Sequence, residues 1–261
     1  MNYTFCAQTD PGRLRDNNED SAVFDETAQL AVLADGMGGY NAGEIASGMA
    51  TVFIKSEMMR WLSEAGRQAR PREIMRALEI CVDNANRSIF NAANSNPQYT
   101  GMGTTLVVCV FQADKLMLGH IGDSRCYRFR HGALMQITKD HSLLQEQMDA
   151  GLITPEQAST SVHKNLVTRA LGVEEVAVLE IHEHVVETDD VFLLCSDGLS
   201  DMVNDADIAQ VLDGSTGLEH KAQRLVALAN EHGGRDNISV LLVQAVAATE
   251  KRGLISRLLG K

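Results

Sequence analysis

Strand-length apolar runs joined by very short turns constrain the fold of this chain more than any other feature. Such runs occur at residues 3–8, 21–25, 29–34, 104–111, 115–121, 124–130, 133–138, 176–186, 189–195 and 238–246. Turn residues alone separate several of them, as at 113–115, 130–132 and 187–190. Because so short a connection joins strands that run in opposite directions, the sequence predicts antiparallel sheets.

Helical patterns interrupt the series of strands. Apolar residues recur at helical spacing from Ala42 to Trp61 and again from Ile74 to Ile89. A third apolar stripe runs from about 217 to 232, just before the last strand. Strands, two long helices, further strands, a helix and a final strand together predict an α+β layered domain.

Composition indicates one globular domain. Of the 261 residues, 44% are apolar, 22% are charged and only four are proline, so no segment has the composition of a long linker. No apolar run reaches the ~20 residues that span a bilayer, and the first residues lack the order of a signal peptide. Five widely spaced cysteines predict free thiols in a reducing cytoplasm. The net charge of −12 argues against a nucleic-acid partner.

Aspartates stand at the ends of four predicted strands. Asp35 and Asp197 each follow an apolar run, Asp123 lies between two strands, and Asp236 precedes the last strand. Each alone is an ordinary turn residue, but strand ends that meet at one edge would crowd these carboxylates together. Like charges at that range need a counter-charge, and Mg²⁺ or Mn²⁺ suits oxygen ligands. The sequence has no His/Cys cluster with zinc spacing.

Three glycines follow Asp35 within the next four residues. We expect Asp35 to be a metal ligand held rigidly by its buried strand. Gly36 would let the backbone approach the ions and offer its carbonyl, while Gly38 and Gly39 would leave space for a substrate. The alternative is a glycine-rich strand-to-helix turn without any ligand.

Six short motifs occur in order along the chain: "RLRDNNED", "LADGMGG", "GTT", "GDSR", "CSDGLSD" and "GGRDNISV". Together they resemble the metal-dependent Ser/Thr protein phosphatases of type 2C, in their compact bacterial form. The resemblance covers roughly residues 3–246. It implies a four-layer α-β-β-α sandwich, in which two stacked antiparallel sheets are flanked by helix pairs. We expect one catalytic domain over residues 1–246 and a short basic tail over 247–261.

The resemblance also implies a two-metal centre and a role for each acidic motif residue. Asp35 matches the carboxylate that bridges both metals, and Gly36 matches a backbone carbonyl ligand. Asp197 and Asp236 match further ligands of the first metal. Glu19 and Asp20 match acidic residues that hold metal-bound waters. Asp123, with Asp197 or Asp201, matches a third metal site, and Arg15 matches the arginine that binds the substrate phosphate.

The reaction implied by the resemblance is hydrolysis of phosphoserine and phosphothreonine in proteins. Two ions of Mn²⁺ or Mg²⁺, ~3.5–4 Å apart, lower the pKa of a water, and the bridging hydroxide attacks phosphorus directly. Arg15 would clamp two phosphoryl oxygens. Whether a third ion binds is left open. The expected partners are phosphorylated proteins and a Ser/Thr kinase whose action this protein opposes, and a monomer is expected.

Residues 139–172 break the strand pattern and contain only short helical fragments. Taken alone, they predict either a surface loop with two small helices or a flap beside an active site. The resemblance places the family's mobile flap here.

One position departs from the family pattern. In some branches a histidine follows the Asp-Gly of the first loop and protonates the leaving group, whereas this chain has Met37. The proton must then come from a metal-bound water or another residue. His141 is one candidate, although a solvent-facing polar role is the simpler expectation for it.

Three other functions fit the sequence less well. The spacing of Cys81 and Arg87 matches a phosphate-binding cysteine loop, but it lies within a helical stripe that offers no free N–H groups. The glycines after Asp35 lack the lysine and spacing of a nucleotide-binding loop. A catalytically inactive phosphatase-like binding module should show damaged metal-ligand positions, and none is evident.

Several features are expected to have no catalytic role. His182 and His184 would share one face of a solvated edge strand, and Trp61 would pack between helices. From Lys251 to Lys261 the chain has four basic residues and no acidic one. A weakly packed tail is expected there, with a docking segment for a partner or an anionic membrane as the alternative.

Overall fold

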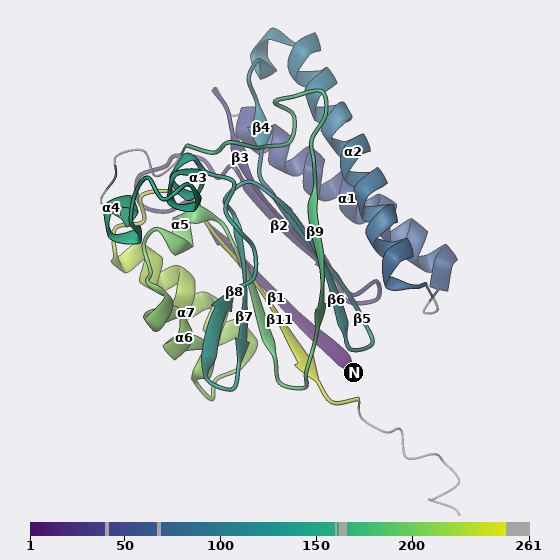
Figure 1. Cartoon of the computed structure of the whole chain (residues 1–261), viewed down its shortest axis with the longest axis vertical. Coiled ribbons are helices and arrows are strands. Elements are labelled where there is room, and N and C mark those ends of the chain that lie inside the picture. Colours follow the sequence, from purple (N-terminus) through teal and green to yellow (C-terminus); the bar gives the residue numbers. More distant parts are fainter. Residues whose placement is uncertain (40–41, 67–68, 160, 162–165, 249–261) are drawn as a thin grey trace, which may run out of the picture.

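Two antiparallel sheets form the centre of the molecule (Figure 1). The computed structural model describes residues 1–39, 42–66, 69–159, 161 and 166–248. In what we call the β1 sheet, the strands follow the order β1 (Asn2–Asp10), β11 (Ile238–Val246), β10 (Val191–Cys195), β7 (Arg125–Arg130) and β8 (Ala133–Gln136). In the β3 sheet the order is β2 (Asp20–Asp25), β3 (Leu30–Met37), β5 (Leu106–Gln112), β6 (Lys115–Ile121) and β9 (Glu180–Val185), and the two-residue β4 (Gly103–Thr104) also pairs with β3.

Helices cover the outer face of each sheet. The long pair α1 (Ala42–Ala65) and α2 (Pro71–Ser95) packs on the β3 sheet, and α6 (Asp205–Asp213) and α7 (Leu218–Glu231) pack on the β1 sheet. Short elements complete the described chain: the 3-10 turn η2 (Pro97–Tyr99) and the helices α3 (Leu143–Asp149), α4 (Pro155–Ser159) and α5 (Asp197–Ser200). The predicted four-layer α-β-β-α sandwich of two antiparallel sheets is confirmed.

Alternation along the central strands explains why they read as continuous apolar runs. In β3, Leu30, Val32 and Ala34 face the core beneath α1 and α2, whereas Ala31 and Leu33 face the core between the two sheets. Side chains of a strand alternate between its two faces, and here both faces are buried. The run therefore carries no polar residue until it reaches Asp35.

Two elements differ from the sequence-based expectation. The strand expected at 176–186 is shorter, because only Glu180–Val185 pairs with β6. The helix α6 was not predicted, since only Ile208 and Leu212 of its nine residues are buried and too little apolar periodicity results. Asn204 caps this helix by accepting a hydrogen bond from the backbone of Asp207 at 3.0 Å.

The segment before β9 is held by one buried side chain on α2. The Asn86 amide donates to the carbonyls of Glu174 and Glu175 at 3.0 and 3.1 Å, and its oxygen accepts from the backbone of Gly172 at 2.7 Å. Asn86 is fully buried. Three backbone groups of an irregular segment thus depend on a single residue for their hydrogen bonds.

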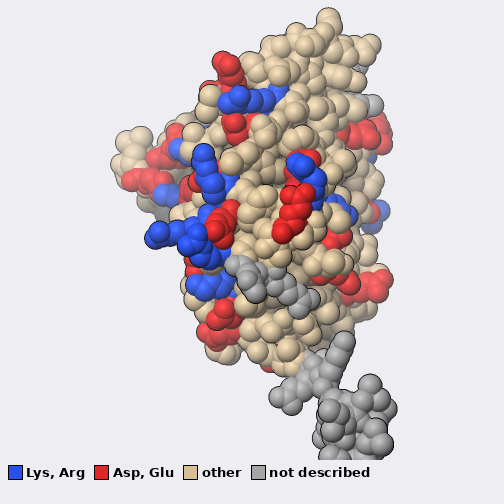
Figure 2. Space-filling view, turned by 90° about the vertical axis from the view of Figure 1, so that its right-hand side faces the viewer, with Lys and Arg blue, Asp and Glu red and all other residues tan. Residues whose placement is uncertain are grey.

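Charges are mixed on the surface that the structure describes. On the face shown in Figure 2, the described Lys and Arg side chains lie beside Asp and Glu side chains and form no continuous basic surface. The pairs Arg60–Glu57 and Arg76–Glu79 on α1 and α2 are typical of this arrangement. Within the described chain, no helix is both long enough and apolar enough to cross a membrane.

Replacing Asn86 tests this anchor. Asn86→Ala should lower the free energy of unfolding by roughly 2–4 kcal/mol, because it leaves the buried N–H of Gly172 and the partly buried carbonyls of Glu174 and Glu175 without partners. The melting temperature should fall by about 5–15 °C in a chain of this size. Asn84→Ala, at an exposed position on the same helix, is the matched control and should change stability little. Equal melting temperatures for the two variants would contradict the anchoring role.

Candidate active site

Six carboxylates from distant parts of the sequence converge at one end of the two sheets. Asp20 on β2 lies directly opposite Asp35 on β3. Asp197 opens α5 immediately after β10, and Asp236 precedes β11. The members of the cluster are Asp20, Asp35, Asp123, Asp197, Asp201 and Asp236. The strand ends that carry these carboxylates therefore meet at one edge of the sheets.

Backbone hydrogen bonds hold Asp35 in place. Its N–H donates to the Thr105 hydroxyl at 2.9 Å, and its carbonyl accepts from the Thr105 N–H at 2.9 Å and the Thr104 hydroxyl at 2.8 Å. The next N–H, of Gly36, donates to the Glu19 carbonyl at 3.1 Å. The carboxylate thus projects from a backbone that is fixed on both sides.

Glycines let the elements around the cluster approach closely. A Cβ on Gly36 would overlap the carbonyl of Gly43 in the first turn of α1 and lie 2.6 Å from the Glu19 carbonyl. A Cβ on Gly198 would overlap the carbonyl of Asn237. The structure therefore gives Gly36 a packing reason that sequence alone did not reveal.

Asp20 has one carboxylate oxygen without a partner. Oδ2 accepts a hydrogen bond from the Ser196 hydroxyl at 2.7 Å, and Ser196 in turn accepts from the backbone of Ser239 at 3.0 Å. Oδ1 is buried and has no hydrogen-bond donor among the described residues. A buried carboxylate oxygen left without a donor is costly, and a cation would satisfy it.

Asn237 ties the loop that carries Arg15 to the start of β11. Its amide donates to the carbonyls of Pro11 and Asn17 at 3.0 and 2.8 Å, and its oxygen accepts from the backbone of Glu19 at 2.7 Å. Sequence reasoning assigned no role to this buried residue. The only available signal was its position directly after Asp236 in the last motif.

Arg15 bridges the two ends of the chain across the site. Its guanidinium donates to Asp236 Oδ2 at 2.7 Å, and its side chain is 52% exposed. The hydrogen bond to Asp236 raises the pKa of Arg15, while burial acts against this. The guanidinium therefore stays charged and has donors free for a ligand that arrives from solvent.

A second part of the site lies beneath the segment 139–142. A small cavity there is lined by Asp123, Asp197, Asp201, Arg125, Asp140, Ser142 and Ser200. Arg125 binds Asp140 in bidentate fashion, because Nη2 donates to Oδ2 at 2.7 Å and Nε donates to Oδ1 at 3.1 Å. The sequence motifs gave no role to Arg125 or Asp140, although Arg125 closes the "GDSR" motif.

Crowding and burial make the carboxylates hard to ionise. Burial first, then the charges of Asp20 and Asp197, raises the pKa of Asp35 well above its usual value. Burial likewise raises the pKa of Asp197, with Asp123 and Asp236 adding to it. For Asp20 and Asp123, burial raises the pKa to about 6. An all-oxygen donor set of this kind fits hard divalent cations such as Mg²⁺ or Mn²⁺.

Residues 13–232 of the chain match the protein phosphatase 2C family. The chain belongs to this family. It is 37% identical over 244 residues to the serine/threonine phosphatase stp of Listeria innocua, an alignment that covers 91% of this chain and 94% of that protein. It is 39% identical to the serine/threonine protein phosphatase PstP of Mycobacterium tuberculosis, where the alignment covers 93% of this chain but only 45% of that protein.

Solved structures agree with this membership. The Mycobacterium tuberculosis phosphatase PstP/Ppp superposes with a TM-score of 0.86 at 36% identity, covering 95% of this chain and 100% of that one. The catalytic domain of PstP in complex with two manganese ions gives a TM-score of 0.83 at 37% identity, covering 94% of this chain and 99% of that one.

The structure corrects one expectation and agrees with others. His141 is buried rather than solvent-facing, and both ring nitrogens have partners. His182 is on the edge strand β9, as predicted, and Trp61 packs against the core of the β3 sheet and its helices. Residues 249–261 of the expected tail at 247–261, like residues 160 and 162–165 of the predicted flap, lie outside the described residues.

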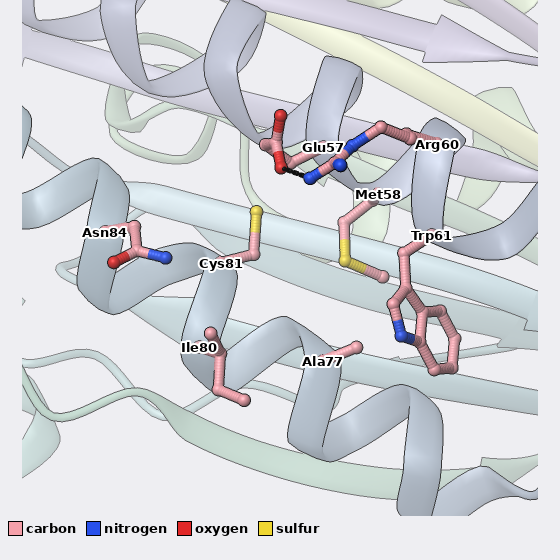
Figure 3. A pocket seen from close by; sticks show the side chains of 8 residues that line it. All are labelled: Glu57, Met58, Arg60, Trp61, Ala77, Ile80, Cys81 and Asn84. Atoms are coloured by element: carbon pink, nitrogen blue, oxygen red, sulfur yellow. Dashed lines mark hydrogen bonds and ion pairs between the residues drawn. The ribbon is translucent and has the colours of Figure 1, made fainter. Parts of the chain in front are cut away.

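A cysteine-based mechanism is not supported. Cys81 is on α2 and lines a cavity of about 220 Å³ between α1 and α2, beside Met58 and Trp61 (Figure 3). Burial raises the pKa of Cys81 to about 12, the opposite of what a nucleophilic thiolate requires. The Arg87 of the same motif pairs with Asp83 instead.

The pKa of Asp123 predicts how metal-free stability depends on pH. Its pKa is about 6 in the fold and ~3.9 in an unfolded chain. The folded state therefore binds more protons between these values, and this group's contribution to stability falls as pH rises through the window. In EDTA, Asp123→Asn should be more stable than wild type at pH 7.5, by up to a few kcal/mol.

The stability difference between Asp123→Asn and wild type should shrink as the pH falls and approach zero at about pH 3, below the unfolded pKa of ~3.9, where the carboxyl is protonated in both states. Thermal unfolding of both proteins in EDTA, at several pH values, measures it. A difference that does not change with pH would contradict the electrostatic account.

Proposed function

We propose that this protein is a divalent-cation-dependent phosphatase that hydrolyses phosphoserine and phosphothreonine in proteins. The observation that carries the proposal is the convergence of six carboxylates with a half-exposed arginine paired to one of them. Members of the family with closely similar sequences are named serine/threonine phosphatases. Phosphorylated proteins are therefore its substrates.

Two core cations would be held by Asp35, as the shared ligand, and by the Gly36 carbonyl, Asp197 and Asp236. Glu19 and Asp20 would hold waters bound to these cations. Asp123 with Asp197 or Asp201 would hold a third cation. When bound, such ions supply a water of lowered pKa as nucleophile and positive charge opposite the phosphoryl oxygens. Mn²⁺ and Mg²⁺ both fit the donor set.

The protein's own residues orient the phosphate. Arg15 is held by Asp236 at 2.7 Å, so its remaining N–H groups point from a fixed position towards an entering phosphate. Asp236 is itself held by the backbone of Asn237, which donates to Oδ1 at 2.9 Å. This preorganisation avoids the cost of ordering the guanidinium when the substrate binds.

The leaving serine or threonine oxygen must receive a proton, and Met37 cannot donate one. His141 is also excluded as the donor, because Gly122 and Glu180 occupy its two nitrogens and the side chain is buried. We propose that water supplies this proton.

Several finer features belong to the same proposal. Residues 1–246 would form one catalytic domain, with the segment 139–172 as a flap over the site. The protein would act as a monomer in the cytoplasm and oppose a Ser/Thr kinase. A catalytically inactive binding module is disfavoured, because the carboxylate positions are intact and their mutual repulsion would serve no purpose without cations.

Phosphate release from a phosphothreonine peptide tests the central claim. Turnover should require Mn²⁺ or Mg²⁺ and stop in EDTA. Asp35→Asn should lower kcat at least ~100-fold, since charge stabilisation in the transition state is lost. Asp213→Asn, at an exposed position at the end of α6, is the control and should keep full activity. A folded wild-type protein that shows no turnover with either ion would overturn the phosphatase assignment.

Replacing Arg15 separates substrate binding from chemistry. Arg15→Ala should raise KM for the phosphopeptide by ~10–100-fold with a smaller effect on kcat, because a charge-assisted bidentate contact to phosphate is lost. Arg72→Ala, an exposed arginine on α2 without an ion pair to any described residue, controls for net charge. Steady-state kinetics on both variants measures KM and kcat. An unchanged KM for Arg15→Ala would contradict a role of Arg15 in binding the phosphate.

A further inference from the structure

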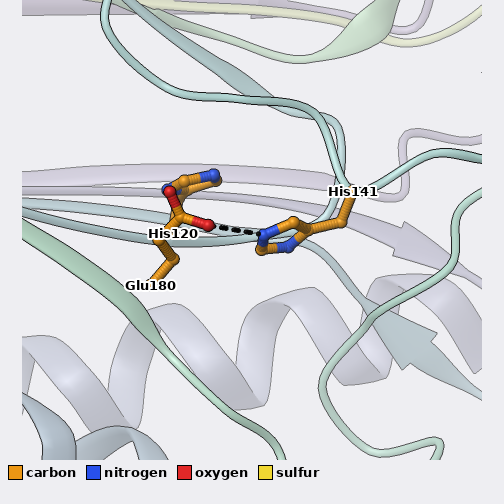
Figure 4. A group of neighbouring side chains, drawn as sticks. All are labelled: His120, His141 and Glu180. Atoms are coloured by element: carbon orange, nitrogen blue, oxygen red, sulfur yellow. Dashed lines mark hydrogen bonds and ion pairs between the residues drawn. The ribbon is translucent and has the colours of Figure 1, made fainter. Parts of the chain in front are cut away.

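Two buried histidines and a partly exposed glutamate lie together next to the carboxylate cluster (Figure 4). His120 is on β6, His141 stands at the start of the 139–172 segment, and Glu180 opens β9. One ligand atom of each lies within 4.8 Å of the others, and the two histidines are buried. The ring centroids of His120 and His141 are 4.8 Å apart. Such a group has the composition of a metal site.

Hydrogen-bond directions fix where each ring carries its proton. His120 Nε2 lies 2.8 Å from the carbonyl of Lys139, and a carbonyl only accepts, so the His120 proton is on Nε2. His141 Nδ1 lies 3.1 Å from the backbone N–H of Gly122, which only donates, so His141 Nδ1 is unprotonated. The proton of His141 is therefore on Nε2, 3.2 Å from Glu180 Oε2.

This proton placement argues against a metal site. A cation between the three side chains would need the lone pair of His141 Nε2. The proton would then have to move to Nδ1, where it would face the Gly122 N–H at 3.1 Å. Metal-binding histidines instead donate from the nitrogen that does not bind the metal. His141 accepts there, so the group has another purpose.

His141 holds both backbone polar groups of Gly122. The imidazole Nδ1 of His141 accepts a hydrogen bond from the Gly122 N–H, and the backbone N–H of His141 donates to the Gly122 carbonyl at 2.9 Å. Gly122 has a φ of +102°, and a Cβ there would lie 2.7 Å from the side chain of Thr105, which also bonds Asp35. The turn before Asp123 is thus fixed between His141 and Thr105.

The neighbours of His141 face the opposite way. Asp140 and Ser142 line the cavity that Asp123, Asp197 and Asp201 also line. The His141 ring instead points towards Glu180 on β9. The His141 carbonyl also accepts from Thr168 at 2.8 Å, which joins the two ends of the 139–172 segment. One side chain thus links the base of this segment, the Gly122–Asp123 turn and the edge strand β9.

We propose that His141, protonated on Nε2, is a positioning residue that fixes the Gly122 backbone and thereby aims Asp123 into the cation cavity. Glu180 fixes the tautomer by accepting from Nε2. The inference rests on the proposed function for the identity of the cation, but it concerns the hydrogen bond to Gly122, which is tested separately.

Two substitutions divide the functions of the ring. In His141→Asn the side-chain oxygen replaces Nδ1 as the acceptor for Gly122 and the reach to Glu180 is lost. In His141→Gln the amide nitrogen replaces Nε2 as the donor to Glu180 and the acceptor for Gly122 is lost. Both variants remove the imidazole, so an effect of lost ring packing would be similar in the two.

Binding of Mn²⁺ is measured by calorimetry and by the shift of the melting temperature, without substrate. We expect the weakest Mn²⁺ site to lose at least tenfold in affinity in His141→Gln, and to stay within about threefold of wild type in His141→Asn. Equal Mn²⁺ binding by the two variants would overturn the positioning role. A wild-type protein that binds no Mn²⁺ would overturn the proposed function as well, so the two failures are distinguishable.

Nitrogen-15 NMR spectra of the histidine side chains identify their tautomers. This measurement uses the wild-type protein, so it does not depend on whether a variant folds. Both His120 and His141 should show the Nε2–H form, with and without Mg²⁺. A Nδ1–H form for His141 would overturn the proposal. Displacement of the His141 Nε2 proton by stoichiometric Zn²⁺ would overturn it in favour of a metal site at His120, His141 and Glu180.

Discussion

Carboxylates that repel one another are held close together at one end of the two sheets, and the surrounding structure must resist this repulsion. Asp20 and Asp35 face each other across neighbouring strands, and Asp197 and Asp236 approach them from the other sheet. Burial and the charges of Asp20, Asp197 and Asp236 raise the pKa of Asp35, and burial and the charge of Asp236 raise the pKa of Asp197, so folding without cations costs free energy at neutral pH. Only a rigid scaffold can hold such an arrangement ready for a ligand, and the sandwich of two sheets with its helices supplies one.

Rigidity comes from hydrogen bonds that lie just behind the carboxylates. Thr105 and Thr104 fix the backbone of Asp35, and Ser196 holds one oxygen of Asp20. Asn237 fastens the loop that carries Arg15 to the start of β11. These polar residues are buried because they hold the site together rather than because they react, and a substitution there would loosen the geometry without touching a substrate.

Elements from both sheets and from the loops position the residues of the site. The first turn of α1 packs so closely on β3 that Gly36 and Gly43 have no room for a side chain. On the other sheet, α5 follows β10 directly and presents Asp197 from its first turn. The segment 139–142 lies against the cavity and is attached there by the Arg125–Asp140 pair and by the hydrogen bond between His141 and Gly122. Residues that touch a ligand and residues that hold them are therefore interleaved along the chain.

The antiparallel sheets, the long helices and candidate ligands such as Asp35 and Asp197 could be predicted from the sequence, because periodicity and turn chemistry are local properties. It missed α6, whose few buried residues give no clear period, and it gave Asn237 and Asp140 no role. It also placed His141 in solvent. Which strand ends meet and which polar groups are buried together became evident only from the folded chain, because such contacts join residues far apart in the sequence, as between Arg15 and Asp236.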